Sequence, residues 1–123
     1  MAEAYDAARM AENVAAIREK MAAAAKSAGR TPGDVLLCAV CKTRSCETVR
    51  ESAALPVDLF GENHMQELVE HFDAGAFLQK PAHFIGHLQT NKVKYIAPYV
   101  SMIEAVDSLK LLREINRQAE RCN

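Results

Sequence analysis

A continuous apolar run from Val35 to Cys41 that ends abruptly at Lys42 restricts the fold of this chain more than any other feature. The run has the length of a β-strand and lies between Gly33 and the polar residues that follow Lys42. Because it does not alternate with polar residues, it predicts a strand buried on both faces, as in a parallel sheet covered by helices. Lys42 is then the first polar side chain at the carboxyl end of that strand, where α/β folds place their ligands and their chemistry.

The pattern of a strand followed by a helix repeats along the chain. A leading helix is expected over residues 4–28, where apolar residues recur every three or four positions: Met10, Val14, Ile17 and Met21. Strands are expected at 35–41, 57–60, 82–88 and 100–106, each followed by an amphipathic helical stretch. The strands begin about 20 to 25 residues apart, which predicts parallel strands joined by crossover helices.

A polar side chain follows each expected strand: Lys42, Asn63, His87 and Asp107. Spacing alone does not separate an open doubly wound sheet from a (β/α)8 barrel, but a barrel rim gathers such residues on one face. A whole barrel of this type takes about 200–250 residues. The 123 residues therefore predict an α/β fold that is half of a (β/α)8 TIM-type barrel. We expect a single domain, 1–123, with a leading helix in 1–31 and four βα units in 32–123.

Composition points to a soluble globular domain, since half of the residues are hydrophobic and a quarter are charged. The formal net charge of −1 and the dispersed charges favour no nucleic-acid partner. No stretch reaches the roughly 18 apolar residues of a membrane span, and the first residues do not have the pattern of a secretory signal. We therefore expect a cytoplasmic protein without a membrane partner.

Lys42 is the main candidate for chemistry. By strand alternation it shares a face with Leu36, Cys38 and Val40, so we expect it to be partly desolvated, which favours the neutral amine that attacks aldehydes. An aldehyde cofactor is the natural partner for such a lysine. The alternative is a lysine that only extends its ammonium group into solvent.

The other candidates have competing structural explanations. Cys38 and Cys41 point to opposite faces of one strand, so we expect small buried residues and neither a redox pair nor a metal site. His83 and His87 share a face, but this is a weak indication of a metal site, and His87 is better interpreted as a rim residue beside a cofactor ring or as a structural histidine. Asn63 either faces the cofactor or caps the following helix.

Several residues are expected to begin helices, because serine, threonine and aspartate accept hydrogen bonds from the first backbone N–H groups. These are Ser45, Thr90 and the pair Asp107-Ser108. Lys92 lies in the same helix-start segment as Thr90, where it can also attract an anion.

Four motifs resemble, in order, the pyridoxal-phosphate homeostasis protein family: 39–43 (AVCKT), 60–67 (FGENHMQE), 83–92 (HFIGHLQTNK) and 106–108 (VDS). The resemblance covers nearly the whole chain but only the N-terminal half of the family's barrel. It implies a non-catalytic carrier of pyridoxal 5′-phosphate (PLP), related to the barrel domain of alanine racemases. PLP would be held as an imine on Lys42.

The chain departs from the family pattern in two respects. Cys41 stands where the family usually has serine, and Arg44 and Ser45 stand where lysine and proline are common. The second half of the barrel, with its glycine- and serine-rich phosphate-binding loops, does not correspond to any part of this sequence. Two alternatives follow: a fragment of an alanine-racemase-like enzyme, which needs a second catalytic group opposite the lysine, and an inert barrel fragment that does not bind PLP.

Half of a barrel also predicts self-association. The first and fourth strands would have unpaired backbone groups, and apolar side chains would lie exposed where further strands normally cover them. Two copies that pair these edges about a two-fold axis would form an eight-stranded barrel with two Lys42 residues on one rim. The alternative is a monomer whose leading and terminal helices fold over the open edges.

Overall fold

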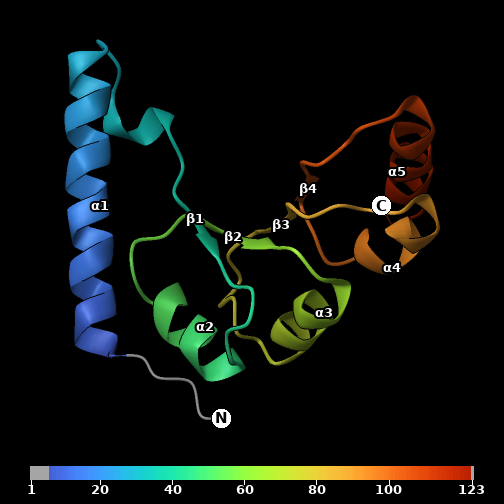
Figure 1. The fold of residues 1–123 in the computed structure, drawn as a ribbon, viewed down its shortest axis with the longest axis horizontal. Helices are drawn as coiled ribbons and strands as arrows, with labels where there is room; N and C mark the ends of the chain where they lie inside the picture. The colour runs from blue at the N-terminus through green and yellow to red at the C-terminus, as the bar shows by residue number, and fades with distance from the viewer. Residues whose placement is uncertain (1–5, 123) are drawn as a thin grey trace.

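The computed structural model describes residues 6–122 as a small parallel sheet with helices between its strands (Figure 1). The elements in chain order are α1 (Ala7–Ser27), η1 (Pro32–Asp34), β1 (Cys38–Val40), α2 (Cys46–Ala53), β2 (Leu59–Glu62), α3 (Met65–Asp73), β3 (Ala82–Phe84), η2 (Thr90–Lys92), α4 (Val93–Ile96), β4 (Met102–Ile103) and α5 (Leu109–Cys122). The beginning expected for the leading helix, Ala4, lies outside the described residues.

The four strands follow one another in the sheet in the order β1-β2-β3-β4, and every neighbouring pair is parallel. Val40 lies opposite Gly61, which in turn lies opposite His83. Helices α2 and α3 lie together on one side of this sheet (Figure 1). The arrangement confirms the predicted α/β fold, with strands and helices alternating as in half of a (β/α)8 barrel.

The strands are shorter than the sequence predicted. The run expected at 35–41 forms a strand only at Cys38–Val40, and those expected at 82–88 and 100–106 shrink to Ala82–Phe84 and Met102–Ile103. The second strand moves toward the C-terminus, from 57–60 to Leu59–Glu62.

The prediction that the first strand is buried on both faces is wrong. Leu36 is 61% exposed and Val40 is 50% exposed, whereas Cys41 is buried. The helices cover one face of the sheet, and among the described residues no second layer covers the other face. The apolar run therefore indicated a strand correctly, but it did not indicate that one face of the strand is open.

The core lies between the sheet and its helices. Phe60 and Phe84 point from the strands toward the helices, where Leu68 and Ile96 are fully buried against them. The rings of Phe60 and Phe77 stack with centroids 5.0 Å apart. Burying large apolar side chains of this kind stabilises a fold by about 1.5–3 kcal/mol each, which makes this layer the main source of stability.

Two of the predicted helix caps are confirmed and two are wrong. Ser45 Oγ accepts the N–H of Thr48 at the start of α2, and Ser108 Oγ accepts the N–H of Leu111 at the start of α5. Thr90 does not cap α4, because the 3-10 turn η2 intervenes and α4 begins after Lys92. Ser108, not Asp107, supplies the side-chain cap of α5, since the Asp107 carboxylate is directed instead toward His87, 3.9 Å away.

The apolar stripes of the two outer helices are only partly buried. In α1, Ile17 is 45% exposed and Ala25 alone among the described residues of that helix is buried, while Val14 packs against the core. In α5, Leu111 and Gln118 are buried while Leu112 is exposed. Within residues 6–122, no helix combines the length and the apolar character needed to cross a membrane.

Asp58 joins three segments that precede or flank the sheet. Its Oδ2 atom accepts the backbone N–H of Leu37 at 2.6 Å and a guanidinium N–H of Arg18 at 2.7 Å. Arg18 also donates to the carbonyl of Pro56 at 2.7 Å. The hydrogen bond from Leu37, together with the hydrogen bond and the positive charge of Arg18, outweighs burial and lowers the pKa of Asp58. This carboxylate therefore ties α1 to the segments that enter β1 and β2.

Replacement of this carboxylate tests the connection. We expect Asp58→Asn to lower the free energy of unfolding by about 1–2 kcal/mol at pH 7, because two hydrogen bonds lose their charged acceptor. The folded pKa lies below the ordinary value of about 3.9, so the stabilisation is present above that pH and is lost as pH falls through the folded pKa. Urea unfolding should show a smaller difference in the free energy of unfolding between parent and variant at pH 3 than at pH 7. Glu19→Gln, at an exposed position on α1, is the control; a difference that does not depend on pH would contradict the assignment.

Candidate functional site

Lys42 lies in a tight turn at the carboxyl end of β1. Arg44 N–H donates to the carbonyl of Cys41 at 3.1 Å, and Thr43 between them has φ +62°. A positive φ at a β-branched residue is strained and is found mainly where surrounding structure holds it, often at functional sites. Lys42 is exposed, so the predicted partial desolvation is not observed. The reason is that apolar neighbours on its face, such as Val40, are themselves half-exposed.

Helix α3 holds this turn by two hydrogen bonds. Glu67 Oε2 accepts the N–H of Thr43 at 2.7 Å, and His71 Nε2 lies 2.8 Å from the carbonyl oxygen of Arg44. Glu67 and His71 are four residues apart, so one face of the helix carries both groups. The strained turn that carries Lys42 is therefore held by the neighbouring βα unit.

His71 is also joined to Glu62 in a fully buried pair. The His71 Nδ1 and Glu62 Oε2 atoms are 2.6 Å apart, and their side chains are 2% and 0% exposed. Burial raises the pKa of Glu62. Burial acts to lower the pKa of His71, but its hydrogen bonds to Glu62 and to Arg44 outweigh burial and raise it. Because the Arg44 carbonyl can only accept, Nε2 carries a hydrogen, and a further proton is shared between Nδ1 and Glu62.

Cys41 completes this buried polar group. Its sulfur, a Glu62 oxygen and a His71 nitrogen all lie within 4.8 Å of one another. The prediction that Cys41 is buried is confirmed, at 3% exposed, but its surroundings are polar. Cys38 is only half-buried and lies on the other face, where its sulfur would meet a Cβ placed on Gly61 at 2.9 Å.

Sequence reasoning did not identify Glu62, Glu67 or His71 as site residues. A signal for one of them was present, because strand alternation puts Glu62 on the same face as Phe60, which is the face that the helices cover. A glutamate predicted to be buried needs a partner, and the following helix was the nearest source of one. Nothing in the local pattern indicated that the partner would be His71.

Asn63 and His87 lie at the ends of neighbouring strands and line one small cavity. The cavity has a volume of about 210 Å³, and Lys92 also lines it. A Cβ on Gly86 would lie 2.5 Å from the Asn63 carbonyl oxygen, so the two strand ends approach this closely because residue 86 is glycine. The N-cap of α3 is His64, so the capping role considered for Asn63 is not observed. The roles of Asn63 and His87 toward a ligand stay predictions.

His83 and His87, which the sequence places on one face, each lie beside a different carboxylate. His83 Nδ1 lies 3.4 Å from Glu104 Oε2, and His87 Nδ1 lies 3.9 Å from Asp107 Oδ2. Each histidine approaches a different carboxylate at the edge of the sheet. His87 is also largely exposed, with 76% of its side chain accessible.

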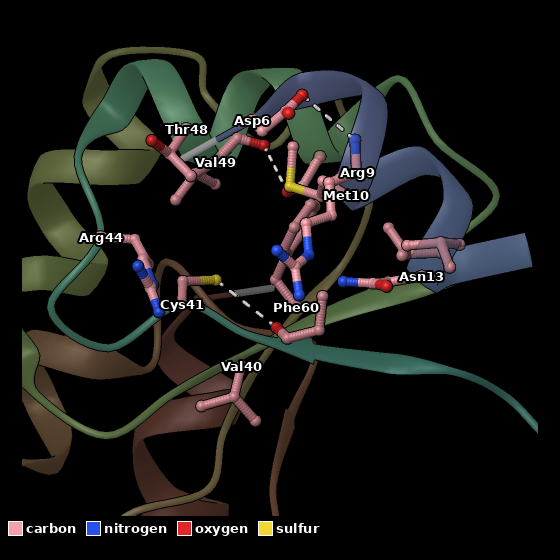
Figure 2. Close-up of a pocket in the computed structure, with 14 residues that line it drawn as sticks. Asp6, Arg9, Met10, Asn13, Val40, Cys41, Arg44, Thr48, Val49 and Phe60 are labelled. Carbon is pink, nitrogen blue, oxygen red and sulfur yellow. Dashed lines mark hydrogen bonds between the residues drawn. The ribbon is translucent and has the colours of Figure 1, made fainter. Parts of the chain in front are cut away.

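A larger cavity of about 710 Å³ lies on the helix-facing side, between the first turns of α1 and the elements β1 and α2 (Figure 2). Arg9, Asn13 and Arg44 line it together with Cys41 and Phe60. Lys42 is not among the residues that line this cavity.

Comparison with known proteins identifies relatives of the chain. No protein-family model matches it. It is 38% identical over 109 residues to the pyridoxal phosphate homeostasis protein of Pseudomonas aeruginosa, covering 89% of this chain and 47% of the relative. It is 35% identical over 112 residues to the protein of the same name from Escherichia coli K12, covering 89% of this chain and 48% of the relative.

The chain is also similar in fold to solved structures. An unknown protein from Bifidobacterium adolescentis matches with a TM-score of 0.84 and 30% identity, over 98% of this chain and 54% of the other. PipY of Synechococcus elongatus PCC7942, solved with PLP bound, matches with a TM-score of 0.75 and 29% identity, over 91% of this chain and 49% of PipY. By sequence and by fold, the chain is a homologue of the pyridoxal phosphate homeostasis proteins and spans about half the length of the relatives it matches.

Proposed function

We propose that this chain is a PLP-binding protein of intracellular PLP homeostasis that holds the cofactor as an imine on Lys42 without catalysing a reaction. The observation that carries the proposal is the strained turn at Lys42, which Glu67 and His71 hold at the carboxyl end of β1. The relatives named for PLP homeostasis support it, as does the PLP-bound structure of PipY. We place this role in the cytoplasm.

The residues present fit the aldehyde end of PLP. Lys42 is exposed, so its amine can attack an aldehyde carbon, and the condensation forms a C=N bond with loss of water. Asn63 and His87, at the ends of β2 and β3, are the residues proposed to face the cofactor. Their shared cavity of about 210 Å³ is smaller than a usual ligand pocket of about 300–1,000 Å³, so this part of the site holds only part of a ligand.

A carrier fits the surroundings of Lys42 better than a racemase-like enzyme does. A racemase needs a second acid or base free to act opposite the lysine. The ionisable groups that contact the Lys42 turn, Glu67 and His71, are already engaged by its backbone. We propose that they position the turn and take no part in proton transfer.

The imine assignment is tested by reduction. We expect PLP added to the parent chain to give an imine absorbance that borohydride traps as a mass increase on Lys42, and Lys42→Ala to abolish both signals. The variant should keep its free energy of unfolding within about 0.5 kcal/mol, because the side chain is exposed. Lys110→Ala is the control. Equal binding by Lys42→Ala, or trapping on Lys92, would disprove the assignment.

The role of Glu67 is tested by a pair of substitutions. Glu67→Ala removes the acceptor for the Thr43 N–H and lets the strained turn relax, so we expect imine formation to weaken by about tenfold, equivalent to about 1.4 kcal/mol. Glu67→Gln keeps an oxygen acceptor and should retain most of the affinity. Thr43→Gly in the Glu67→Ala background should recover part of it, because glycine adopts positive φ without strain. Equal losses in the Ala and Gln variants would exclude this explanation.

We also propose that a second copy of the chain covers its open sheet edges. Leu36 and Val40 are exposed beside β1, and Met102, Val106 and Leu109 are exposed beside β4. Pairing β1 of one copy with β4 of the other would bury both groups of apolar side chains. It would also give the backbone N–H and C=O groups of these edge strands hydrogen-bond partners.

Sedimentation of the purified chain at micromolar concentration tests this arrangement. We expect a dimer in concentration-dependent exchange with monomer, and Val40→Lys should shift the balance toward monomer because it places a charge in the contact. Ile17→Lys, at an exposed position on α1, is the matched control. A compact monomer at every concentration would rule out the dimer.

A further inference from the structure

Three side chains with metal-ligating atoms meet beneath the Lys42 turn. The Cys41 sulfur, a Glu62 carboxylate oxygen and a His71 ring nitrogen lie within 4.8 Å of one another, and all three residues are buried. Cys41 follows β1, Glu62 ends β2 and His71 lies in the last turn of α3. The fold brings these groups together from three separate elements, and Lys42 itself contributes nothing to the cluster.

Glu62 has an oxygen atom without a partner. Its Oε2 atom is engaged by His71, but Oε1 is buried and has no hydrogen-bond donor among the described residues. Glu62 is 0% exposed, so solvent does not satisfy this oxygen. A buried carboxylate oxygen in this condition is a site where a bound cation would compensate the lost hydration.

His71 already has the orientation of a metal ligand. Its Nε2 atom lies 2.8 Å from the Arg44 carbonyl, to which it donates a hydrogen bond. Histidines that bind metals through one ring nitrogen commonly donate the other N–H to a backbone carbonyl or a carboxylate, which fixes the ring. Nδ1 is therefore the nitrogen that can ligate, once the proton that it shares with Glu62 has left.

The local charge favours a cation. A divalent cation would balance one thiolate and one carboxylate, with His71 neutral, so the buried cluster would carry no net charge.

We propose that Cys41, Glu62 and His71 bind one divalent transition-metal ion of the zinc class. A sulfur, an imidazole nitrogen and a carboxylate oxygen suit Zn²⁺ and its analogues Co²⁺ and Cd²⁺, whereas Mg²⁺ and Ca²⁺ prefer oxygen ligands alone. On binding, the thiol proton and the shared Glu62–His71 proton leave to solvent, and three metal–ligand bonds form. Three protein ligands leave one tetrahedral position for water.

Binding of the metal ion requires one local rearrangement and a route from solvent to the three ligands. Bonds of about 2.0–2.2 Å to nitrogen and oxygen need these two ligand atoms farther apart than the 2.6 Å hydrogen bond between His71 and Glu62. Rotation of the Glu62 carboxylate, which presents the unpartnered Oε1, provides that separation. Cys41 lines the cavity between α1 and α2, which supplies an approach from solvent (Figure 2).

Titration of the full chain with Co²⁺ tests this site, because a thiolate bound to tetrahedral Co²⁺ gives a charge-transfer band in the near ultraviolet. We expect saturable binding of one ion per chain, and displacement by Zn²⁺ that bleaches the band. Cys41→Ser should abolish the band, and His71→Asn should weaken Co²⁺ binding at least tenfold. Cys46→Ser and Cys122→Ser are the matched controls and should leave the band unchanged.

The parent chain alone provides a second test that does not depend on a variant folding. Zn²⁺ should slow alkylation of Cys41 severalfold, measured by peptide mass mapping, while the exposed Cys122 reacts at an unchanged rate. The absence of a saturable Co²⁺ band in the parent, its persistence in Cys41→Ser, or protection of Cys122 in place of Cys41 would each overturn the proposal. None of these readouts involves PLP, so they stand apart from the proposed function.

Discussion

The parallel pairing of β1, β2, β3 and β4 brings four strand ends to one edge, and each group of the candidate site depends on that pairing. The side chains of Ile85 and Cys38 pack over Gly61, where a Cβ would lie 2.8 Å and 2.9 Å from them. With these strands in register, the Lys42 turn follows β1 and Asn63 follows β2 at the same edge. Polar residues that are about twenty positions apart in the chain thereby become neighbours in the fold.

Helix α3 connects the stability of the fold to the geometry of the site. Its Leu68 packs into the core, while its Glu67 and its buried His71 hold the backbone after Lys42. The strain at Thr43 is small beside the free energy that buries the core, so the fold can maintain it. A change in the packing of α3 is therefore expected to alter the backbone of the Lys42 turn through these two hydrogen bonds.

The proposed PLP binding and the proposed self-association both depend on the face of the sheet opposite α2 and α3. Leu36 and Val40 are exposed there, and Lys42 is exposed as well. The small cavity that Asn63 and His87 line follows the neighbouring strands β2 and β3. The chain spans about half the length of the relatives it matches.

The sequence by itself determined the order of strands and helices, the caps at Ser45 and Ser108, and the position of Lys42 at a strand end. Those features follow from local periodicity and from hydrogen bonds between residues a few positions apart. Tertiary structure alone decided that one face of β1 stays open, that Asn63 is not a cap, and that Glu62 pairs with His71 beside Cys41. The reason is physical: burial and buried polar pairing depend on which segments meet in space, and a local pattern does not specify the partner segment.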